Sequence, residues 1–256
     1  MKFGVCTDVK NAQILKNIGY DYLELSLNNI AELSEGKYQV LKDEVFKSPL
    51  KPYAFNCLLP GKIKVTGEGV DKTKVISYLK VALNRASELG GTIVVFGSGN
   101  SRRVPEGFNM ERAFQQLIEF LKIASSIAEE NGIIIVIEPL RRAETNIINT
   151  AAEGLRLAKE INHPNIRLLV DFYHMTLENE NSDILLKANR EYIKHIHIAN
   201  PKGRLWPKNI EEAEYVNFFN NLRAINYDGG ISIEGNTSEI TVDAPISMKF
   251  FKRIKM

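Results

Sequence analysis

The chain has 256 residues, of which 44% are hydrophobic and 25% are charged, a composition typical of a soluble globular protein. Its 33 basic and 31 acidic side chains leave a formal charge of +2, which argues against the basic stripe that nucleic-acid binding needs. No apolar stretch approaches the roughly 20 residues of a membrane span, and residues 1–7 resemble a strand rather than a signal peptide. We therefore expect one domain over residues 1–256, located in the cytoplasm, with neither nucleic acid nor membrane as a partner.

Eight short apolar runs recur along the chain and predict eight strands. In chain order they are Phe3–Cys6, Tyr22–Leu27, Tyr53–Leu59, Thr92–Phe96, Ile133–Ile137, Ile166–Val170, Ile193–Ile198 and Gly230–Ile233. Two cysteines are too few for a disulfide framework, so we expect Cys6 and Cys57 to be buried, unreactive apolar residues.

Helical patterns lie between most of these runs. The clearest is Met110–Glu130, where apolar side chains repeat at intervals of three and four residues. Asp71 and Asn109 are predicted to cap helix N-termini, and Thr150 with Glu153 forms a capping-box pattern. Strands and helices therefore alternate along the chain.

Alternation of this kind requires crossover connections and hence a parallel sheet. Eight units of about 32 residues each predict a single eight-stranded parallel β/α (TIM) barrel. An open sheet remains the alternative, because periodicity does not reveal closure. The chain lacks the glycine-rich phosphate-binding motifs that usually accompany open sheets.

Four predicted strands end in or contain a residue that can bind a metal ion: Glu138, Asp171, His197 and Glu234. Active sites of such barrels lie at the carboxyl ends of the strands, so these side chains are expected to meet at one mouth. Strand side chains alternate between two faces, so with Ile196, Ile198, Ile231 and Ile233 packing outward against helices, His195, His197 and Glu234 point into the barrel. Glu24 points inward by the same alternation. We expect His195 to support the site or the core rather than to bind metal, and we assign no role to Glu24.

Three carboxylates crowded in a half-buried space repel one another unless a cation neutralises them. Oxygen donors with one imidazole and no thiolate predict one divalent metal ion, manganese first, with magnesium, cobalt or zinc as alternatives. The alternative explanation is that these residues form salt bridges in loops. His163, between Asn162 and Pro164, is expected to be exposed and structural.

Five segments together resemble the sugar phosphate isomerase/epimerase superfamily with the xylose-isomerase-like barrel, most closely its tagatose and psicose 3-epimerase branch. They are FGSGNSRRVPEGF (96–108), IEPLRRAETNIINT (137–150), LLVDFYHM (168–175), HIHIAN (195–200) and ISIEG (231–235). The resemblance implies that Glu138, Asp171, His197 and Glu234 bind the metal. It also implies that Glu138 and Glu234 act as the catalytic acid/base pair.

The same resemblance implies that Glu144, His174 and Arg204 bind substrate oxygens. Glu144 and His174 match the spacing of the family. Arg204 follows His197 by one residue more than in the epimerases, and the acidic residue usual in that loop is missing. A plain surface arginine is the alternative for this position.

The activity implied is epimerisation or isomerisation of a sugar or sugar phosphate, by proton transfer next to a ketone through an enediolate. Alternatives are a dehydratase or hydroxypyruvate isomerase of the same superfamily, and a non-catalytic sugar-binding module. An endonuclease of abasic DNA is disfavoured because the chain has only four histidines. The sequence is also compatible with a homo-oligomer.

Several loop residues keep two interpretations each. The guanidinium groups of Arg102, Arg103, Arg141 and Arg142 can meet a substrate phosphate or carboxylate, or can lie in solvated loops. Trp206 and Phe108 are either sugar-stacking lid residues or loop anchors.

Overall fold

Eight parallel strands form a closed barrel in the computed structural model, which describes residues 1–255. Each strand pairs with the next, and β1 pairs with β8 to close the ring. The strands are β1 (Lys2–Cys6), β2 (Tyr22–Ser26), β3 (Pro52–Asn56), β4 (Ile93–Phe96), β5 (Ile134–Ile137), β6 (Ile166–Asp171), β7 (Ile193–Ile198) and β8 (Gly230–Ile233). The predicted TIM barrel is thereby confirmed, and the open sheet is ruled out.

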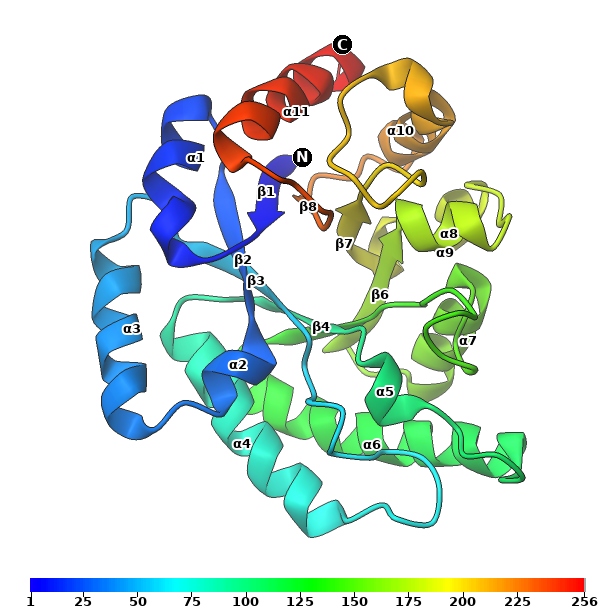
Figure 1. Ribbon diagram of the computed structural model, residues 1–256. Coiled ribbons are helices and arrows are strands. Elements are labelled where there is room, and N and C mark those ends of the chain that lie inside the picture. The colour runs from blue at the N-terminus through cyan, green and yellow to red at the C-terminus, as the bar shows by residue number, and fades with distance from the viewer. Residues whose placement is uncertain (256) are drawn as a thin grey trace.

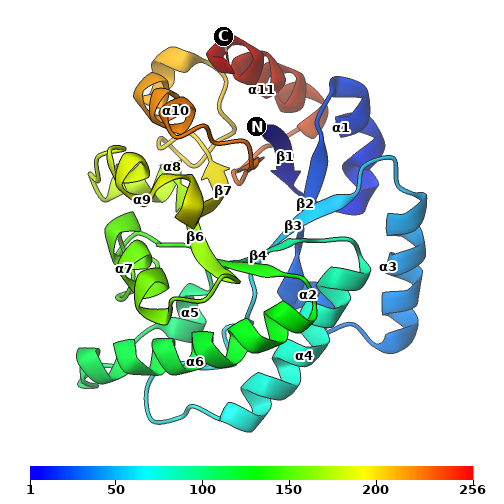
Figure 2. The same cartoon turned by 180° about the vertical axis from the view of Figure 1, so that it is seen from behind.

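Long helices surround the barrel and cover its outer face (Figure 1), and the view from behind shows the same ring (Figure 2). They are α1 (Ala12–Ile18), α3 (Glu35–Lys47), α4 (Lys72–Glu88), α6 (Met110–Glu130), α7 (Ala151–Ile161), α9 (Ile184–Tyr192), α10 (Tyr215–Ala224) and α11 (Ile240–Lys255). Shorter helices lie in the connections: η1 (Val9–Asn11), α2 (Leu27–Ala31), α5 (Gly99–Arg102), α8 (Phe172–Leu177) and η2 (Ile210–Glu212). Among the described residues, none of the helices has the length and apolar character needed to cross a membrane.

The strands are apolar on both faces because both faces are covered. Outward residues pack with the helices in one large core, which includes Ile196, Ile198, Ile231 and Ile233. A smaller cluster of Ala54, Ile93, Val95, Val136 and Leu169 lies in a separate core. The predicted outward direction of the four isoleucines agrees with this division.

Two strand ends differ from the prediction. Strand β3 ends at Asn56, although the apolar run continues to Leu59. The backbone at Cys57 has φ 55°, which lies outside the extended region and so terminates the strand. Leu27 begins helix α2 and does not continue β2.

The predicted helix caps are present, with one change. The side chains of Asp71, Asn109 and Thr150 each accept a hydrogen bond from the N–H three residues later, at 3.0, 2.9 and 3.1 Å. Glu153 returns a hydrogen bond, but it accepts from the N–H of Asn149 at 2.6 Å, one residue before the expected capping-box partner. These caps fix the residues at which helices α4, α6 and α7 begin.

Candidate active site

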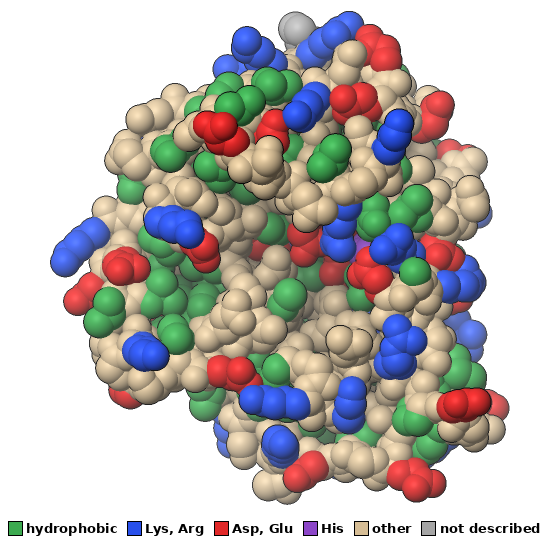
Figure 3. All heavy atoms as spheres, viewed as in Figure 1, with side chains coloured by type: hydrophobic (Ala, Val, Ile, Leu, Met, Phe, Trp, Pro, Cys, Tyr) green, Lys and Arg blue, Asp and Glu red, His purple; other side chains and the backbone are tan. Residues whose placement is uncertain are grey.

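Four side chains predicted from the sequence meet at the carboxyl ends of neighbouring strands. Glu138 directly follows β5, Asp171 ends β6, His197 lies in β7 and Glu234 directly follows β8. Each offers one ligand atom, and these atoms all lie within 4.8 Å of one another. The first three are buried, whereas Glu234 is partly open to solvent. The face seen in Figure 3 is hollowed near its centre, where acidic, basic and histidine side chains gather.

His197 lies between the two glutamates. Its Nδ1 atom is 3.0 Å from Oε1 of Glu138 and 3.4 Å from Oε2 of Glu234. Its Nε2 atom is 2.9 Å from Oε1 of Glu24, deeper in the barrel. Nδ1 therefore faces Glu138 and Glu234, and Nε2 contacts Glu24 in the barrel interior.

Only one of the two carboxylate oxygens of Asp171 accepts hydrogen bonds from residues 1–255. Oδ1 accepts hydrogen bonds from the N–H groups of Tyr173 at 2.7 Å and His174 at 3.4 Å, which caps helix α8. Oδ2 is buried and has no hydrogen-bond partner among the described residues. Buried polar atoms normally have a partner, so a buried oxygen without one fits a ligand atom for a cation.

The charges in the cluster perturb one another strongly. Burial and the charge of Glu234 raise the pKa of Glu138, and burial raises the pKa of Asp171 from 3.8 to about 6. Burial also acts to raise the pKa of Glu234, but His197 and Arg204 lower it to about 2. Burial acts to lower the pKa of His197, but the surrounding carboxylates raise it well above its usual 6.5. A cation would relieve this crowding of negative charge.

The donor set fits a hard divalent cation. Three carboxylates supply oxygen atoms and His197 supplies one nitrogen, whereas no thiolate belongs to this group of four. Carboxylates from three strands and one imidazole leave room for additional ligands, which is typical of catalytic rather than structural metal sites. The group of Glu138, Asp171, His197 and Glu234 could thus hold a metal ion.

The three residues predicted to bind substrate lie around this cluster. His174, on α8, is buried, and its Nε2 is 3.7 Å from Oδ2 of Asp171 and 3.9 Å from Oε2 of Glu144. Arg204 contacts Oε2 of Glu234 at 2.5 Å and stands 4.9 Å above the ring of Tyr173. The structure therefore brings Glu144, His174 and Arg204 to the same mouth as the four candidate ligands.

The four loop arginines do not share one environment. Arg102 is fully buried and donates to the carbonyl oxygens of Phe96 at 2.8 Å and Glu138 at 2.7 Å, so neither a solvated loop nor an exposed position for a substrate anion describes this residue. The others are all paired: Arg103 with the carbonyl of Glu144, Arg141 with the carboxylate of Glu144, and Arg142 with Glu178. Arg102 braces the backbone beneath Glu138 instead.

Other expectations for loop residues change as well. Cys6 and Cys57 are free thiols that are only half-buried, so their predicted burial is wrong. The partial burial of Cys57 and the nearby carboxylates still raise the pKa of its thiol to about 12, which keeps this thiol protonated and unreactive. Trp206 is buried and donates from Nε1 to the carbonyl of Gly235 at 3.0 Å, so it anchors a loop. His163 is half-buried, 3.9 Å from Glu129.

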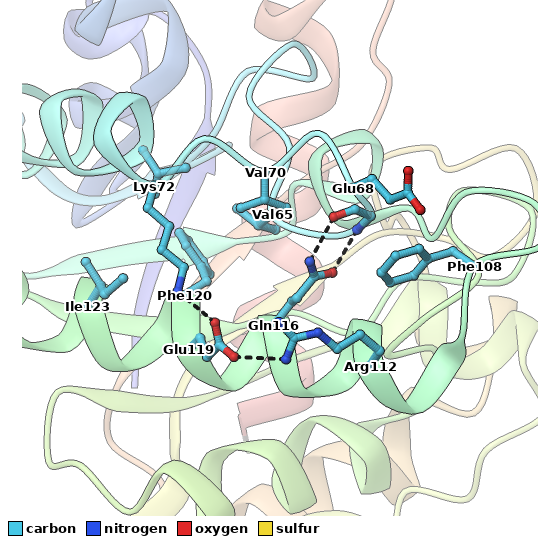
Figure 4. Close-up of a pocket in the computed structure, with 12 residues that line it drawn as sticks. Val65, Glu68, Val70, Lys72, Phe108, Arg112, Gln116, Glu119, Phe120 and Ile123 are labelled. Atoms are coloured by element: carbon cyan, nitrogen blue, oxygen red, sulfur yellow. Dashed lines mark hydrogen bonds and ion pairs between the residues drawn. The ribbon is translucent and has the colours of Figure 1, made fainter.

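A cavity of about 450 Å³ lies between residues 65–75 and helix α6 (Figure 4). Gln116 exchanges two hydrogen bonds of 2.8 Å with the backbone of Gly67, which ties the loop after β3 to the helix. Glu119 pairs with both basic residues of the wall, Lys72 at 2.9 Å and Arg112 at 3.2 Å. Phe108 lines this cavity, which favours the loop-anchor interpretation. None of the four clustered ligand residues lines it.

Two residues at the mouth, Asn56 and Gly97, were not predicted from the sequence to belong to the site. Asn56 ends β3 and donates from Nδ2 to Oε1 of Glu234 at 3.3 Å. Gly97 directly follows β4, and a Cβ atom added there would meet Oε2 of Glu138 at 1.7 Å. Gly97 directly follows the predicted strand Thr92–Phe96, which was a usable signal, but a glycine carries little chemical information. Asn56 lay inside the predicted strand Tyr53–Leu59, so its position gave no signal.

The protein is thus a closed β/α barrel whose mouth carries a candidate metal site of three carboxylates and a histidine. The chain belongs to the xylose isomerase-like TIM barrel family, whose model matches residues 12–254. This confirms the family expected from the sequence motifs.

Individual relatives are similar over most of the chain. An L-ribulose 3-epimerase of Methylomonas sp. (strain DH-1) is 28% identical over 234 residues, which cover 90% of this chain and 78% of that protein. A 3-dehydro-D-guloside 4-epimerase of Escherichia coli (strain K12) is 25% identical over 86% of this chain and 84% of that protein. The crystal structure of a D-psicose 3-epimerase from Clostridium cellulolyticum H10 with D-tagatose superposes with a TM-score of 0.85, at 17% identity and 99% coverage of both chains.

Proposed function

We propose that this chain is a divalent-cation-dependent sugar epimerase, similar to ketose 3-epimerases, which transfers a proton at a carbon next to a ketone. The observation that carries the proposal is the pair of carboxylates Glu138 and Glu234 close to Nδ1 of His197, at 3.0 and 3.4 Å. The relatives named above are epimerases of L-ribulose, a 3-dehydro-D-guloside and D-psicose, which supports a sugar substrate.

A carboxylate alone removes a proton beside a ketone slowly, because the enediolate that results carries unshielded negative charge. Glu138, Asp171, His197 and Glu234 would hold the cation, with manganese as the first candidate. A cation held there would supply Lewis-acid stabilisation of the developing negative charge, an effect worth several kcal/mol. Side chains of the protein would carry out the proton transfer itself.

Glu138 and Glu234 provide two proton-transfer groups on different strands. If one takes the proton and the other delivers a proton to the opposite face, the carbon is inverted. If a proton is instead taken from the terminal carbon on the other side of the ketone and returned to the ketone carbon, the product is the aldose–ketose isomer. The chemistry that we propose first is inversion, because the three relatives reported above are all epimerases.

Glu144, His174 and Arg204 are proposed to orient the substrate hydroxyls. His174 and Glu144 present a donor and an acceptor 3.9 Å apart beside the candidate ligands. The guanidinium of Arg204 contacts Glu234 directly, so it both neutralises that carboxylate and can bind a hydroxyl near it. Such fixed partners hold the reacting carbon in place, which lowers the entropic part of the barrier.

The experiment that tests the proposal follows hydrogen exchange. The protein is stripped with chelator, reloaded with Mn²⁺ and incubated in deuterated water with a panel of free and phosphorylated ketoses, and the products are followed by proton NMR. Cation-dependent deuterium incorporation beside the ketone, with appearance of an epimer, supports the proposal. Incorporation with an aldose product indicates isomerisation, and no exchange with any sugar despite bound Mn²⁺ contradicts an epimerase and favours a dehydratase or a sugar-binding role.

A further inference from the structure

Glu24 is a carboxylate placed in the fully buried interior of the barrel. It is the third residue of β2, and its exposed fraction is 0%. Burial of a carboxylate costs several kcal/mol unless hydrogen bonds and charges compensate it. Here both oxygens have partners: Oε1 lies 2.9 Å from Nε2 of His197, and Oε2 lies 2.7 Å from Nε2 of His195.

The contact with His197 decides which ring nitrogen is available to a ligand. A carboxylate accepts hydrogen bonds, so the proton of the ring resides on Nε2, where Glu24 is. Nδ1 then carries the lone pair when a cation replaces its proton, and Nδ1 is the atom that faces Glu138 and Glu234. With the proton on Nδ1 instead, the ring would donate to Glu138 and could not bind a cation through Nδ1.

The second oxygen of Glu24 is held by a chain of further contacts. His195 is fully buried, and its Nε2 also lies 3.3 Å from Oγ of Ser232, which in turn is 2.9 Å from the hydroxyl of Tyr22. These side chains come from β2, β7 and β8. Glu24 thereby reaches from β2 to two histidines of β7, and it cannot rotate away from His197 without losing the contact with His195.

We infer that Glu24 is the positioning residue of the candidate cation centre, which keeps the proton on Nε2 of His197 and so presents Nδ1 as the ligand atom. His195, Ser232 and Tyr22 hold Glu24 in that orientation. The inference rests on the proposed function, because it assumes that the four clustered residues bind a divalent cation. This positioning role explains why the barrel interior contains the charged side chain of Glu24, which takes no part in the proposed proton transfer.

The substitution E24Q tests the inference with little change of shape. One atom of the glutamine amide is an NH₂ donor, so it cannot accept a proton from one of the two histidines. Mn²⁺ binding to the chelator-stripped protein is measured by the electron paramagnetic resonance signal of free Mn²⁺. We expect Kd to rise by about 10- to 100-fold, the usual cost of losing the residue that orients a metal ligand.

E180Q is the matched control. Glu180 also accepts two hydrogen bonds, from the N–H groups of Ala151 and Ala152 at 2.7 and 3.0 Å, but it is not among the clustered ligand residues. E180Q should retain the Mn²⁺ affinity of the wild type. An E24Q protein that binds Mn²⁺ as tightly as wild type overturns the inference while leaving the proposed function intact, whereas a wild type that binds no Mn²⁺ overturns both.

A measurement on the wild-type protein covers the case in which E24Q does not fold. With ¹⁵N-labelled histidine and the diamagnetic cation Zn²⁺ bound, NMR reports which nitrogen of His197 carries the proton. A proton on Nε2 and none on Nδ1 supports the inference. A proton on Nδ1, or Nε2 without a proton, overturns it regardless of how the variant behaves.

Discussion

Replacement of Gly97 by alanine should displace the carboxylate of Glu138 without altering any charge. A Cβ atom at position 97 would lie 1.7 Å from Oε2 and 2.9 Å from the carboxyl carbon of Glu138. Non-bonded carbon and oxygen atoms do not approach closer than about 3 Å, so the carboxylate must move by more than about 1 Å. Displacements of about 1 Å at reacting groups cost about 100-fold in rate. We therefore expect G97A to lose about two orders of magnitude in turnover and to bind Mn²⁺ more weakly.

The assay compares G97A with G36A. Gly36 lies in α3, and a Cβ added there has no atom within 4 Å, so G36A should keep full turnover and gain about 0.5–1 kcal/mol of stability. Circular dichroism and urea unfolding establish that both variants are folded, and deuterium exchange into the ketose measures turnover. Wild-type turnover and Mn²⁺ affinity in G97A would refute the reasoning, because Glu138 would then not need the position that it occupies in the structure.

Four further substitutions address the site and its surroundings. E138Q and E234Q should each abolish deuterium exchange while leaving a folded barrel, because shape is kept but charge and proton transfer are lost; substantial exchange in either variant contradicts the two-carboxylate mechanism. H163A should leave exchange almost unchanged, since His163 lies in the loop before β6, and a large loss would mean that the site has been placed wrongly. D171N tests the pH dependence of the cation-free protein. The pKa of Asp171 is raised from 3.8 to about 6, so the stability that this group contributes is present below about pH 4 and is lost as the pH rises to about 6. Urea unfolding at pH 4 and pH 7 should show the wild type losing on the order of 2–3 kcal/mol relative to D171N over this range, and a pH-independent difference would contradict the assignment.

The sequence was sufficient to predict the barrel because the spacing of apolar residues and the residue type at each strand end are visible in short stretches of sequence. Alternation along each strand placed His197, in β7, and Glu234, after β8, on the inner face, and the carboxyl-end rule then brought them together with Glu138 and Asp171. Boundaries were less certain because a turn can begin inside an apolar run. At Cys57 the positive φ ends β3, and nothing in residues 53–59 reveals that turn.

Tertiary partners account for most of what could not be predicted. The contact of Glu24 with His197 depends on how far β2 and β7 are staggered around the barrel, and the pattern of a single strand does not contain that stagger. Arg102 was expected near solvent or substrate because arginine is seldom fully buried. Its burial is possible because the carbonyls of Phe96 and Glu138 accept its protons, and these carbonyls lie at the ends of the neighbouring strands β4 and β5.

Asp171 is the last residue of β6, and helix α8 begins at the next residue, so no connecting loop separates strand from helix. The carboxylate that faces the cluster and the helix that carries His174 consequently move as one unit. Between β7 and η2, by contrast, residues 199–209 form an irregular segment that includes Arg204. An engineer who wishes to change the sugar that this barrel accepts should therefore graft sequence into residues 199–209 and leave the junction after β6 intact, because insertion there would dismantle two parts of the site at once.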